Sequence, residues 1–222
     1  MKILDGENVL REKLSSLETL VSPDNILELH TRLNLSNPGY MGEAVVLPPV
    51  LDLDIQKMLN QSWETYKFNE FVSSLVPLDR ELPDIRTDYC KQLNYSTNLP
   101  MASVILVLHN EALSTVLRTV YSVLNRSPES LIREIILVDD CSTLGEIRFL
   151  LFGFSTWLVR KLSANLKQPL KEQVELIPKV TLIRSPTRIG LMQARMLGAV
   201  NSKGPALVFM DSHVEVTPGE KC

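Results

Sequence analysis

Four short apolar runs rich in branched residues, with helical periodicity between them, constrain the fold of this chain more than any other feature. The runs cover residues 101–108, 134–138, 179–184 and 206–210. Runs of this kind are typical of strands buried on both faces, as in a parallel sheet. Apolar stripes with helical spacing begin at Leu113 and Leu191, and a longer helix is predicted over residues 144–168. The alternation predicts an α/β fold with an open parallel sheet covered by helices on both faces.

The first 98 residues differ from the rest of the chain. Prolines and turn pairs recur there, and a rough apolar stripe predicts one helix over residues 54–75. Long apolar segments are few in this region, so we interpret it as a largely irregular stem with short helices rather than an independent domain. The expected organisation is therefore a stem over residues 1–98 and an α/β domain over residues 99–222.

Charge and apolar run lengths exclude two classes of protein. The chain of 222 residues carries a net charge of −3, which argues against a nucleic-acid binder that depends on a basic field. The longest apolar stretch, residues 149–159, is too short to span a bilayer. The first 20 residues mix charges with isolated leucines, unlike a signal peptide or an anchor. We expect no nucleic-acid partner and no transmembrane segment in this chain.

Polar residues follow three of the predicted strands. These residues are the triplet 109–111 (His-Asn-Glu), the pair 139–140 (Asp-Asp) and the triplet 211–213 (Asp-Ser-His). In open parallel sheets, ligands bind beyond the carboxyl ends of the strands. The polar chemistry of this chain therefore falls where the predicted fold would place a ligand.

Asp211 and His213 are the candidate metal ligands. Residues two apart in extended backbone point to the same side, so a carboxylate and an imidazole can converge on one divalent cation. Mixed oxygen and nitrogen ligation suits manganese better than magnesium or calcium. The alternative is a turn in which Asp211 accepts backbone hydrogen bonds and His213 is merely exposed.

Three further residues are candidates for nucleotide binding, each with a structural alternative. Asp140 is placed to accept a hydrogen bond from a ribose or a base, or else to cap a helix. Arg188 either contacts a nucleotide or lies exposed beside a tight turn at Gly190. His109 is otherwise a satisfied polar residue at a strand end. No Gly-x-Gly-x-x-Gly and no P-loop sequence is present, which counts against dinucleotide-binding and P-loop enzymes.

A series of segments, in order along the chain, resembles the polypeptide N-acetylgalactosaminyltransferases. The segments are residues 103–112, 114–120, 122–128, 134–140, 190–195 and 210–213, preceded by residues 82–86 and Cys90. The resemblance implies a GT-A fold, a Rossmann-like parallel sheet whose donor-binding half this chain carries. It also implies a Golgi glycosyltransferase that moves N-acetylgalactosamine from UDP-GalNAc to Ser or Thr of a polypeptide, with retention and with the help of Mn²⁺.

The same resemblance implies a role for each matched site residue. Asp211 and His213 would be metal ligands, and Ser212 would lie beside the sugar. His109, Asp140 and Arg188 would line the uridine pocket; no residue is assigned as catalytic.

The chain also departs from the family pattern. Val214 stands where the family has a cysteine, so a disulfide bond is lost there, and Gln193 replaces an arginine. The acceptor half and a third metal ligand, a histidine, would lie beyond Cys222. We therefore expect a truncated or isoform-like member that is inactive by itself, does not bind the polypeptide acceptor and exposes the strand at residues 206–210 as an apolar edge. The alternatives are a non-catalytic transferase-like regulator and an unrelated nucleotide-binding α/β module.

Overall fold

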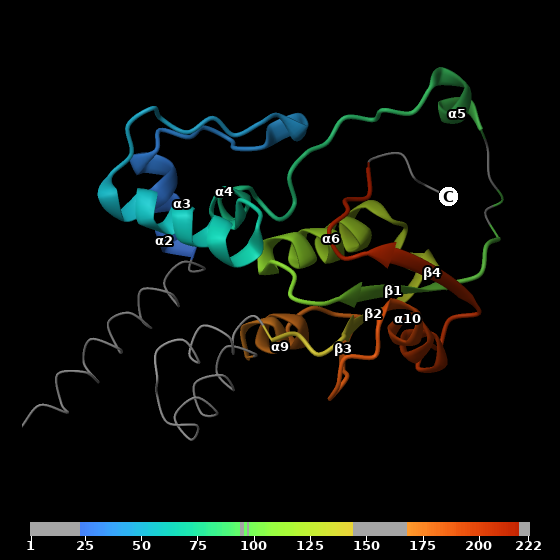
Figure 1. Ribbon diagram of the computed structural model, residues 1–222. Coiled ribbons are helices and arrows are strands. Elements are labelled where there is room, and N and C mark those ends of the chain that lie inside the picture. Colours follow the sequence, from blue (N-terminus) through green and yellow to red (C-terminus); the bar gives the residue numbers. More distant parts are fainter. Residues whose placement is uncertain (1–22, 94–95, 97, 144–167, 218–222) are drawn as a thin grey trace, which may run out of the picture. The chain divides into compact units, whose positions relative to one another are not determined.

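The computed structural model describes residues 23–93, 96, 98–143 and 168–217 (Figure 1). The chain divides into two compact units, residues 1–81 and 82–222, and each is described by itself. The expected boundary after residue 98 falls inside the second unit. The helix predicted over residues 144–168 lies outside the described residues except at its last position.

The described part of the first unit is helical and has its own small core. Its elements are α2 (Pro23–Arg32), η2 (Tyr40–Gly42), α3 (Leu53–Tyr66) and α4 (Glu70–Leu75). The buried side chains that pack together are Leu29, Leu33, Ile55, Phe71 and Leu75. The short helices expected in this region therefore pack around a shared apolar cluster, which stabilises them more than their propensity alone.

The single helix predicted over residues 54–75 is wrong, because the structure has two helices there. Lys67 adopts a left-handed conformation with φ 53° and ends α3, while its N–H bonds the carbonyl of Trp63. Asn69 then caps α4 by accepting a hydrogen bond from the N–H of Val72 at 3.1 Å. The apolar stripe continues across the break because both helices face the same core.

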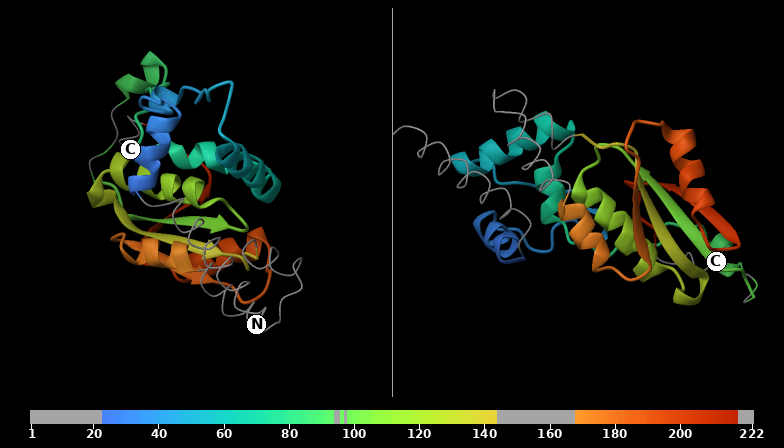
Figure 2. Two further views of the ribbon diagram at one scale, coloured as in Figure 1. Left: turned by 90° about the vertical axis from the view of Figure 1, so that its left-hand side faces the viewer. Right: turned by 90° about the horizontal axis from the view of Figure 1, so that it is seen from below.

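The second unit is built on the predicted parallel sheet. Its strands are β1 (Ala102–Leu108), β2 (Ile132–Asp139), β3 (Val180–Arg184) and β4 (Ala206–Asp211), in the order β3-β2-β1-β4. Its helices are α5 (Asp88–Gln92), α6 (Leu113–Arg126), η3 (Glu129–Leu131), α9 (Gln168–Glu175) and α10 (Leu191–Val200). Figures 1 and 2 show α6 on one face of the sheet and α9 and α10 on the other. No helix in the described ranges is long and apolar enough to cross a membrane.

The two central strands, β1 and β2, carry the core of this unit. Ile105, Ile136 and Val138 pack with Ala194 of α10. Gly198, one turn further along α10, lets the helix backbone approach the sheet closely. A Cβ added there would overlap the Cγ2 methyl of Ile105 and lie 3.2 Å from Cγ2 of Val138. The position of α10 on the sheet therefore depends on having a glycine, with no side chain, at residue 198.

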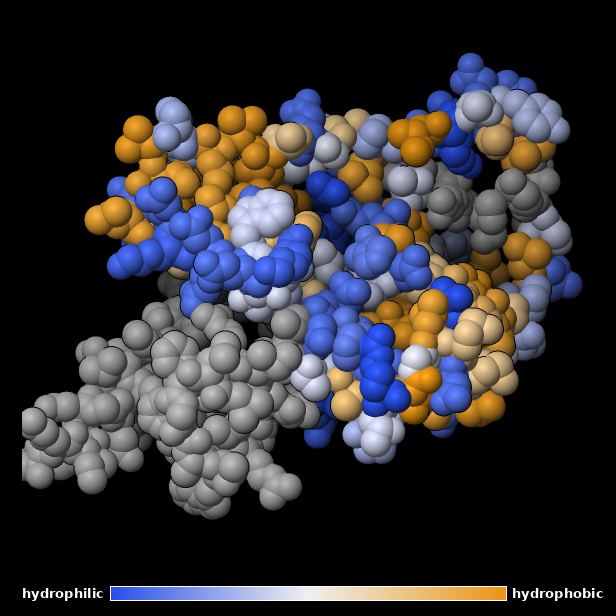
Figure 3. Space-filling model, in the orientation of Figure 1, coloured by the Kyte–Doolittle hydropathy of each residue, from blue (hydrophilic) through white to orange (hydrophobic). Residues whose placement is uncertain are grey.

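The strand β4 forms an edge of the sheet among the described residues, as expected. Leu207, Val208 and Phe209 are 40–44% exposed, whereas the residues of β2 are almost all buried. Figure 3 shows hydrophobic side chains gathered over β4 and α10. The expectation that every strand would be buried on both faces is therefore wrong for the two edge strands, β3 and β4, whose residues are half-buried or exposed.

The segment before β1 is held by a local ion pair. Nε and Nη2 of Arg86 each donate to the carboxylate of Asp84 at 3.0 Å, and the N–H of Arg86 donates to the same group at 3.1 Å. These hydrogen bonds from the Arg86 side chain and backbone lower the pKa of Asp84 to about 2.

Candidate functional site

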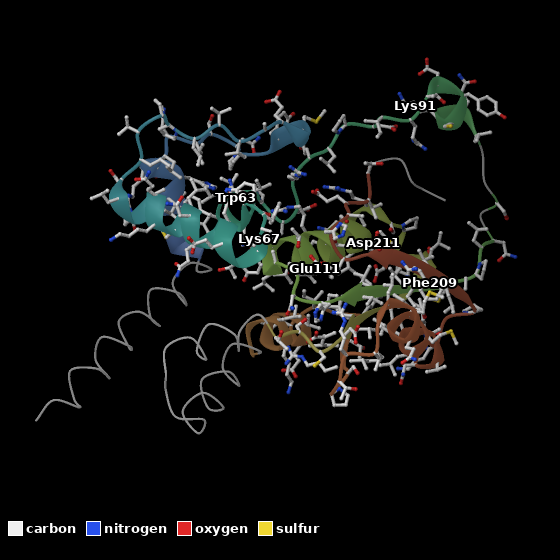
Figure 4. All side chains as sticks on the ribbon, viewed as in Figure 1. Trp63, Lys67, Lys91, Glu111, Phe209 and Asp211 are labelled. Atoms are coloured by element: carbon white, nitrogen blue, oxygen red, sulfur yellow. The ribbon has the colours of Figure 1, made fainter. Side chains whose placement is uncertain are left out.

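The polar ends of β1, β2 and β4 meet around one cavity of about 280 Å³ in the second unit. Its lining residues are Val107, His109, Glu111, Asp140, Arg188, Leu191, Asp211, Ser212 and His213. All six residues singled out from the sequence are therefore brought together here. Figure 4 shows Glu111 and Asp211 at the same end of the sheet. The cavity lies beyond the carboxyl ends of parallel strands, where such sheets bind ligands.

Three lining residues were not predicted. Glu111 belongs to the polar triplet after β1, so its position in the sequence was a signal for it. Val107 and Leu191 carry no such signal, because an apolar residue in a strand or in a helical stripe is expected to be core. Their presence gives the cavity apolar walls beside its charged groups.

The residues 211–213, which we call the Asp-Ser-His turn, place the two candidate metal ligands. The strand β4 ends at Asp211, and the next two residues form a turn rather than extended backbone. The strand argument for a common side is therefore wrong, and the turn brings both side chains to the cavity. Ser212 is buried at 2% exposure, whereas Asp211 and His213 are exposed.

The donor set of the Asp-Ser-His turn fits part of a manganese shell. The turn offers a carboxylate and an imidazole, both accessible, and Mn²⁺ accepts oxygen and nitrogen donors. Oδ1 of Asp211 lies 3.6 Å from Nη2 of Arg195, an ion pair that involves one of the two carboxylate oxygens. Within the described part of the chain, no group of three or more His, Cys, Asp or Glu side chains is placed to hold a metal ion. A cation held by these residues would take its remaining ligands from water and a bound phosphate.

Asp140 is buried at 1% exposure and anchors the loop that leads into α10. Its carboxylate accepts hydrogen bonds from the N–H groups of Ile189 at 2.7 Å and Gly190 at 2.9 Å. Nε of Arg188 lies 3.2 Å from the same carboxylate. A negative charge is favoured at the N-terminus of a helix, which is where Gly190 stands. The carboxylate of Asp140 therefore holds the two residues that precede α10, and it does not bond the N–H groups of the helix's first turn.

His109 joins the loops after β1 and β2. Its Nδ1 lies 2.7 Å from the carbonyl oxygen of Asp140, and its Nε2 lies 3.1 Å from Nδ2 of Asn110. A carbonyl only accepts and an amide nitrogen only donates, so the geometry assigns the proton to Nδ1 and leaves Nε2 as an acceptor. Oδ1 of Asn110 in turn accepts from the N–H of Thr143. Both ring nitrogens of His109 are therefore engaged in holding the cavity wall.

Asp140→Asn is expected to lower the free energy of unfolding by about 2–3 kcal/mol, because it replaces charged hydrogen bonds and turns an amide NH₂ toward a backbone donor. Urea denaturation measures this loss. Asp88→Asn, at a carboxylate whose side chain is 93% exposed, is the matched control and is expected to change stability by less than about 0.5 kcal/mol. Equal urea midpoints for Asp140→Asn and the unaltered chain would contradict the anchoring role.

The cysteines of the described residues carry no disulfide bond. Cys90 and Cys141 are both free thiols and both partly exposed. Cys141 has a left-handed backbone with φ 56°, and its Sγ lies 3.7 Å from the carbonyl oxygen of Pro186. The left-handed backbone of Cys141 therefore contributes to the turn of the loop after β2.

Comparisons with known proteins agree with this geometry. The family model of glycosyl transferase family 2 matches residues 103–150 and 162–222. Polypeptide N-acetylgalactosaminyltransferase 13 of Homo sapiens is 41% identical over 186 residues, which are 84% of this chain and 30% of that protein. Polypeptide N-acetylgalactosaminyltransferase 3 of Drosophila melanogaster is 38% identical over 192 residues, which cover 84% of this chain and 25% of that protein.

A solved structure gives the same relationship. The crystal structure of GalNAc-T7 with UDP, GalNAc and Mn²⁺ superposes with a TM-score of 0.65 and 33% identity, over 83% of this chain and 30% of that one. The expected GT-A type of α/β fold is thereby confirmed. The chain spans less than a third of the length of these relatives. It belongs to glycosyl transferase family 2, and its relatives there are polypeptide N-acetylgalactosaminyltransferases.

Proposed function

We propose that the second unit binds UDP-GalNAc together with Mn²⁺, as the donor-binding part of a polypeptide N-acetylgalactosaminyltransferase. The observation that carries this proposal is the convergence of Asp211, His213 and Arg188 on one cavity at the carboxyl edge of the sheet. The related GalNAc-T7 structure, described with UDP, GalNAc and Mn²⁺, supports the same choice of ligands.

In this proposal each wall of the cavity has a separate task. Asp211 and His213 hold the cation, and a bound divalent cation acts as a Lewis acid that neutralises the diphosphate charge. Arg188, whose side chain is 53% exposed, presents a second positive charge to the nucleotide. Its orientation depends on the buried carboxylate of Asp140.

The remaining roles concern the uridine and the sugar. His109 and Asp140 tie together the loops that border the proposed uridine pocket. Ser212 lies next to both metal ligands, which is where the sugar attached to the diphosphate would lie. Arg188 closes the same pocket from the loop before α10.

Transfer to a polypeptide is a separate step, and we propose that the 222-residue chain does not perform it alone. The Asp-Ser-His turn offers two side-chain donors, and no group of three or more His, Cys, Asp or Glu in the described residues is placed to hold a metal ion, which supports this proposal. The chain would then act as a non-catalytic, transferase-like donor binder. Retention, a Ser/Thr acceptor and a Golgi location belong to the complete enzyme that the family resemblance implies.

Calorimetric titration of UDP with Mn²⁺ and with EDTA tests donor binding. We expect Mn²⁺ to tighten UDP binding at least about tenfold, or about 1.4 kcal/mol, and GDP to bind more weakly than UDP. Equal UDP affinities in Mn²⁺ and EDTA would contradict the proposal. Incubation with labelled UDP-GalNAc, Mn²⁺ and a Ser/Thr-rich peptide is expected to give no labelled peptide, and measurable turnover would overturn the proposed inactivity alone.

A further inference from the structure

The backbone that follows the Asp-Ser-His turn is fastened to α6, a helix about 95 residues earlier in the chain. Oγ1 of Thr119 donates to the carbonyl oxygen of Val214 at 2.7 Å and accepts from the N–H of Val214 at 3.1 Å. One turn further along α6, Oγ of Ser122 accepts from the N–H of Val216 at 3.0 Å, and Nη1 of Arg126 donates to the carbonyl of Val216. Three side chains of one helix stripe therefore make four hydrogen bonds to the backbone of Val214 and Val216.

Thr119 is the contact nearest to the turn, and its surroundings fix it. Thr119 and Ser122 have no exposed surface. The carbonyl of Thr115 also lies within reach of the Thr119 hydroxyl, at 3.0 Å, but a hydroxyl has one proton and Val214 is closer. Because Thr119 both donates to and accepts from the same residue, it constrains the direction of that residue's backbone.

The Asp-Ser-His turn is thus held at both ends by hydrogen-bonded contacts to residues far earlier in the sequence. Before the turn, Asp211 pairs in register with Val107 of β1. After it, Val214 is held by Thr119, so only Ser212 and His213 lie between the two anchors. The strand β4 is half exposed and pairs on one side only, which makes the second anchor important for a rigid turn.

We propose that Thr119 is a positioning residue that orients Asp211 and His213 toward a divalent cation by fixing the backbone of Val214. This inference rests on the proposed function of the cavity. A shell with two protein donors depends strongly on how those donors are oriented, since loss of an outer contact typically costs 10–100-fold in metal affinity. The contact runs through the backbone of Val214, so it does not depend on the side chain at residue 214.

The test compares four forms of the full chain: the unaltered chain, Thr119→Val, Thr119→Ser and Thr115→Val. Each is titrated with UDP in Mn²⁺ and in EDTA, and the ratio of the two affinities is the measured quantity. Thr119→Val keeps the side-chain shape but removes both hydrogen bonds to Val214, and we expect it to lower the ratio about tenfold without changing the affinity in EDTA. Thr119→Ser keeps the hydroxyl and is expected to restore the ratio.

Thr115→Val is the matched control, because the Thr115 hydroxyl donates to the carbonyl of Ala112, the N-cap residue of α6, at 2.7 Å and has no contact with Val214 among the described hydrogen bonds. It is expected to leave the ratio unchanged. A normal ratio in Thr119→Val, or the same loss in Thr119→Ser, would overturn the positioning role. If the unaltered chain shows no manganese effect, the proposed function itself fails; if it shows one that Thr119→Val retains, only the positioning role fails.

Thermal unfolding in EDTA shows whether each variant is folded. Should Thr119→Val lack a cooperative transition, Thr119→Ala takes its place, because it also removes both hydrogen bonds to Val214. A ratio about tenfold lower in Thr119→Ala supports the proposal, and an unchanged ratio overturns it.

Discussion

Asp211→Ala is expected to abolish the manganese-dependent part of UDP binding and to leave the fold intact. Asp211 supplies one of the two protein donors of the proposed cation site, so its loss should exceed the roughly 10–100-fold that an outer contact costs. The side chain is 59% exposed, and its ion pair with Arg195 spans 3.6 Å. An exposed pair of this kind contributes little to stability, and no buried partner is left unsatisfied.

Titration of UDP with and without Mn²⁺ measures the change. Asp211→Asn separates the carboxylate charge from the side-chain shape and is expected to lose most of the manganese effect as well. Asp88→Ala, in α5, removes an exposed carboxylate whose side chain is 93% exposed and should leave the effect unchanged. The proposal for Asp211 would be rejected by an alanine variant that keeps a normal manganese effect.

Gly198→Val is expected to lower the free energy of unfolding by about 3 kcal/mol, at the upper end of the usual cost of overpacking. A Cβ at residue 198 would overlap Cγ2 of Ile105, which belongs to the centre of the sheet and is 1% exposed. The core is packed at crystal-like density, so α10 must move away from β1 rather than absorb the extra methyl groups. Because α10 begins at the loop held by Asp140, the same shift should weaken UDP binding.

Urea denaturation checks this prediction, with Gln193→Val as the matched control. Gln193 lies exposed on the same helix, so valine there should cost less than about 1 kcal/mol through helix propensity. A double-mutant cycle between Gly198→Ala and Ile105→Ala isolates the overlap, and we expect a favourable coupling of about 1 kcal/mol or more. Additive effects in that cycle would show that contact with Ile105 does not limit the size of the side chain at residue 198.

The local patterns of the sequence predicted the strands and the parallel sheet of the second unit. Alternating apolar runs and helical stripes identified four strands, and their parallel arrangement followed from the connections between them. The site could be located for the same reason, since the polar residues after β1, β2 and β4 had to meet at one edge. The strand β1 lies between β2 and β4 in the parallel sheet. The residues at the carboxyl ends of these three strands, His109, Asp140 and Asp211, therefore lie at the same edge.

Contacts between residues far apart in the sequence were decided by the tertiary structure alone. A periodic pattern reports which face of an element is apolar, but not which distant backbone group a polar side chain will reach. The carboxylate of Asp140 accepts a hydrogen bond from the N–H of Gly190, 50 residues away, and Thr119 holds Val214 across 95 residues. The sequence by itself therefore determined the sheet and the place of the cavity, whereas only the packing of α6 and α10 on that sheet determined how the Asp-Ser-His turn and Arg188 are held.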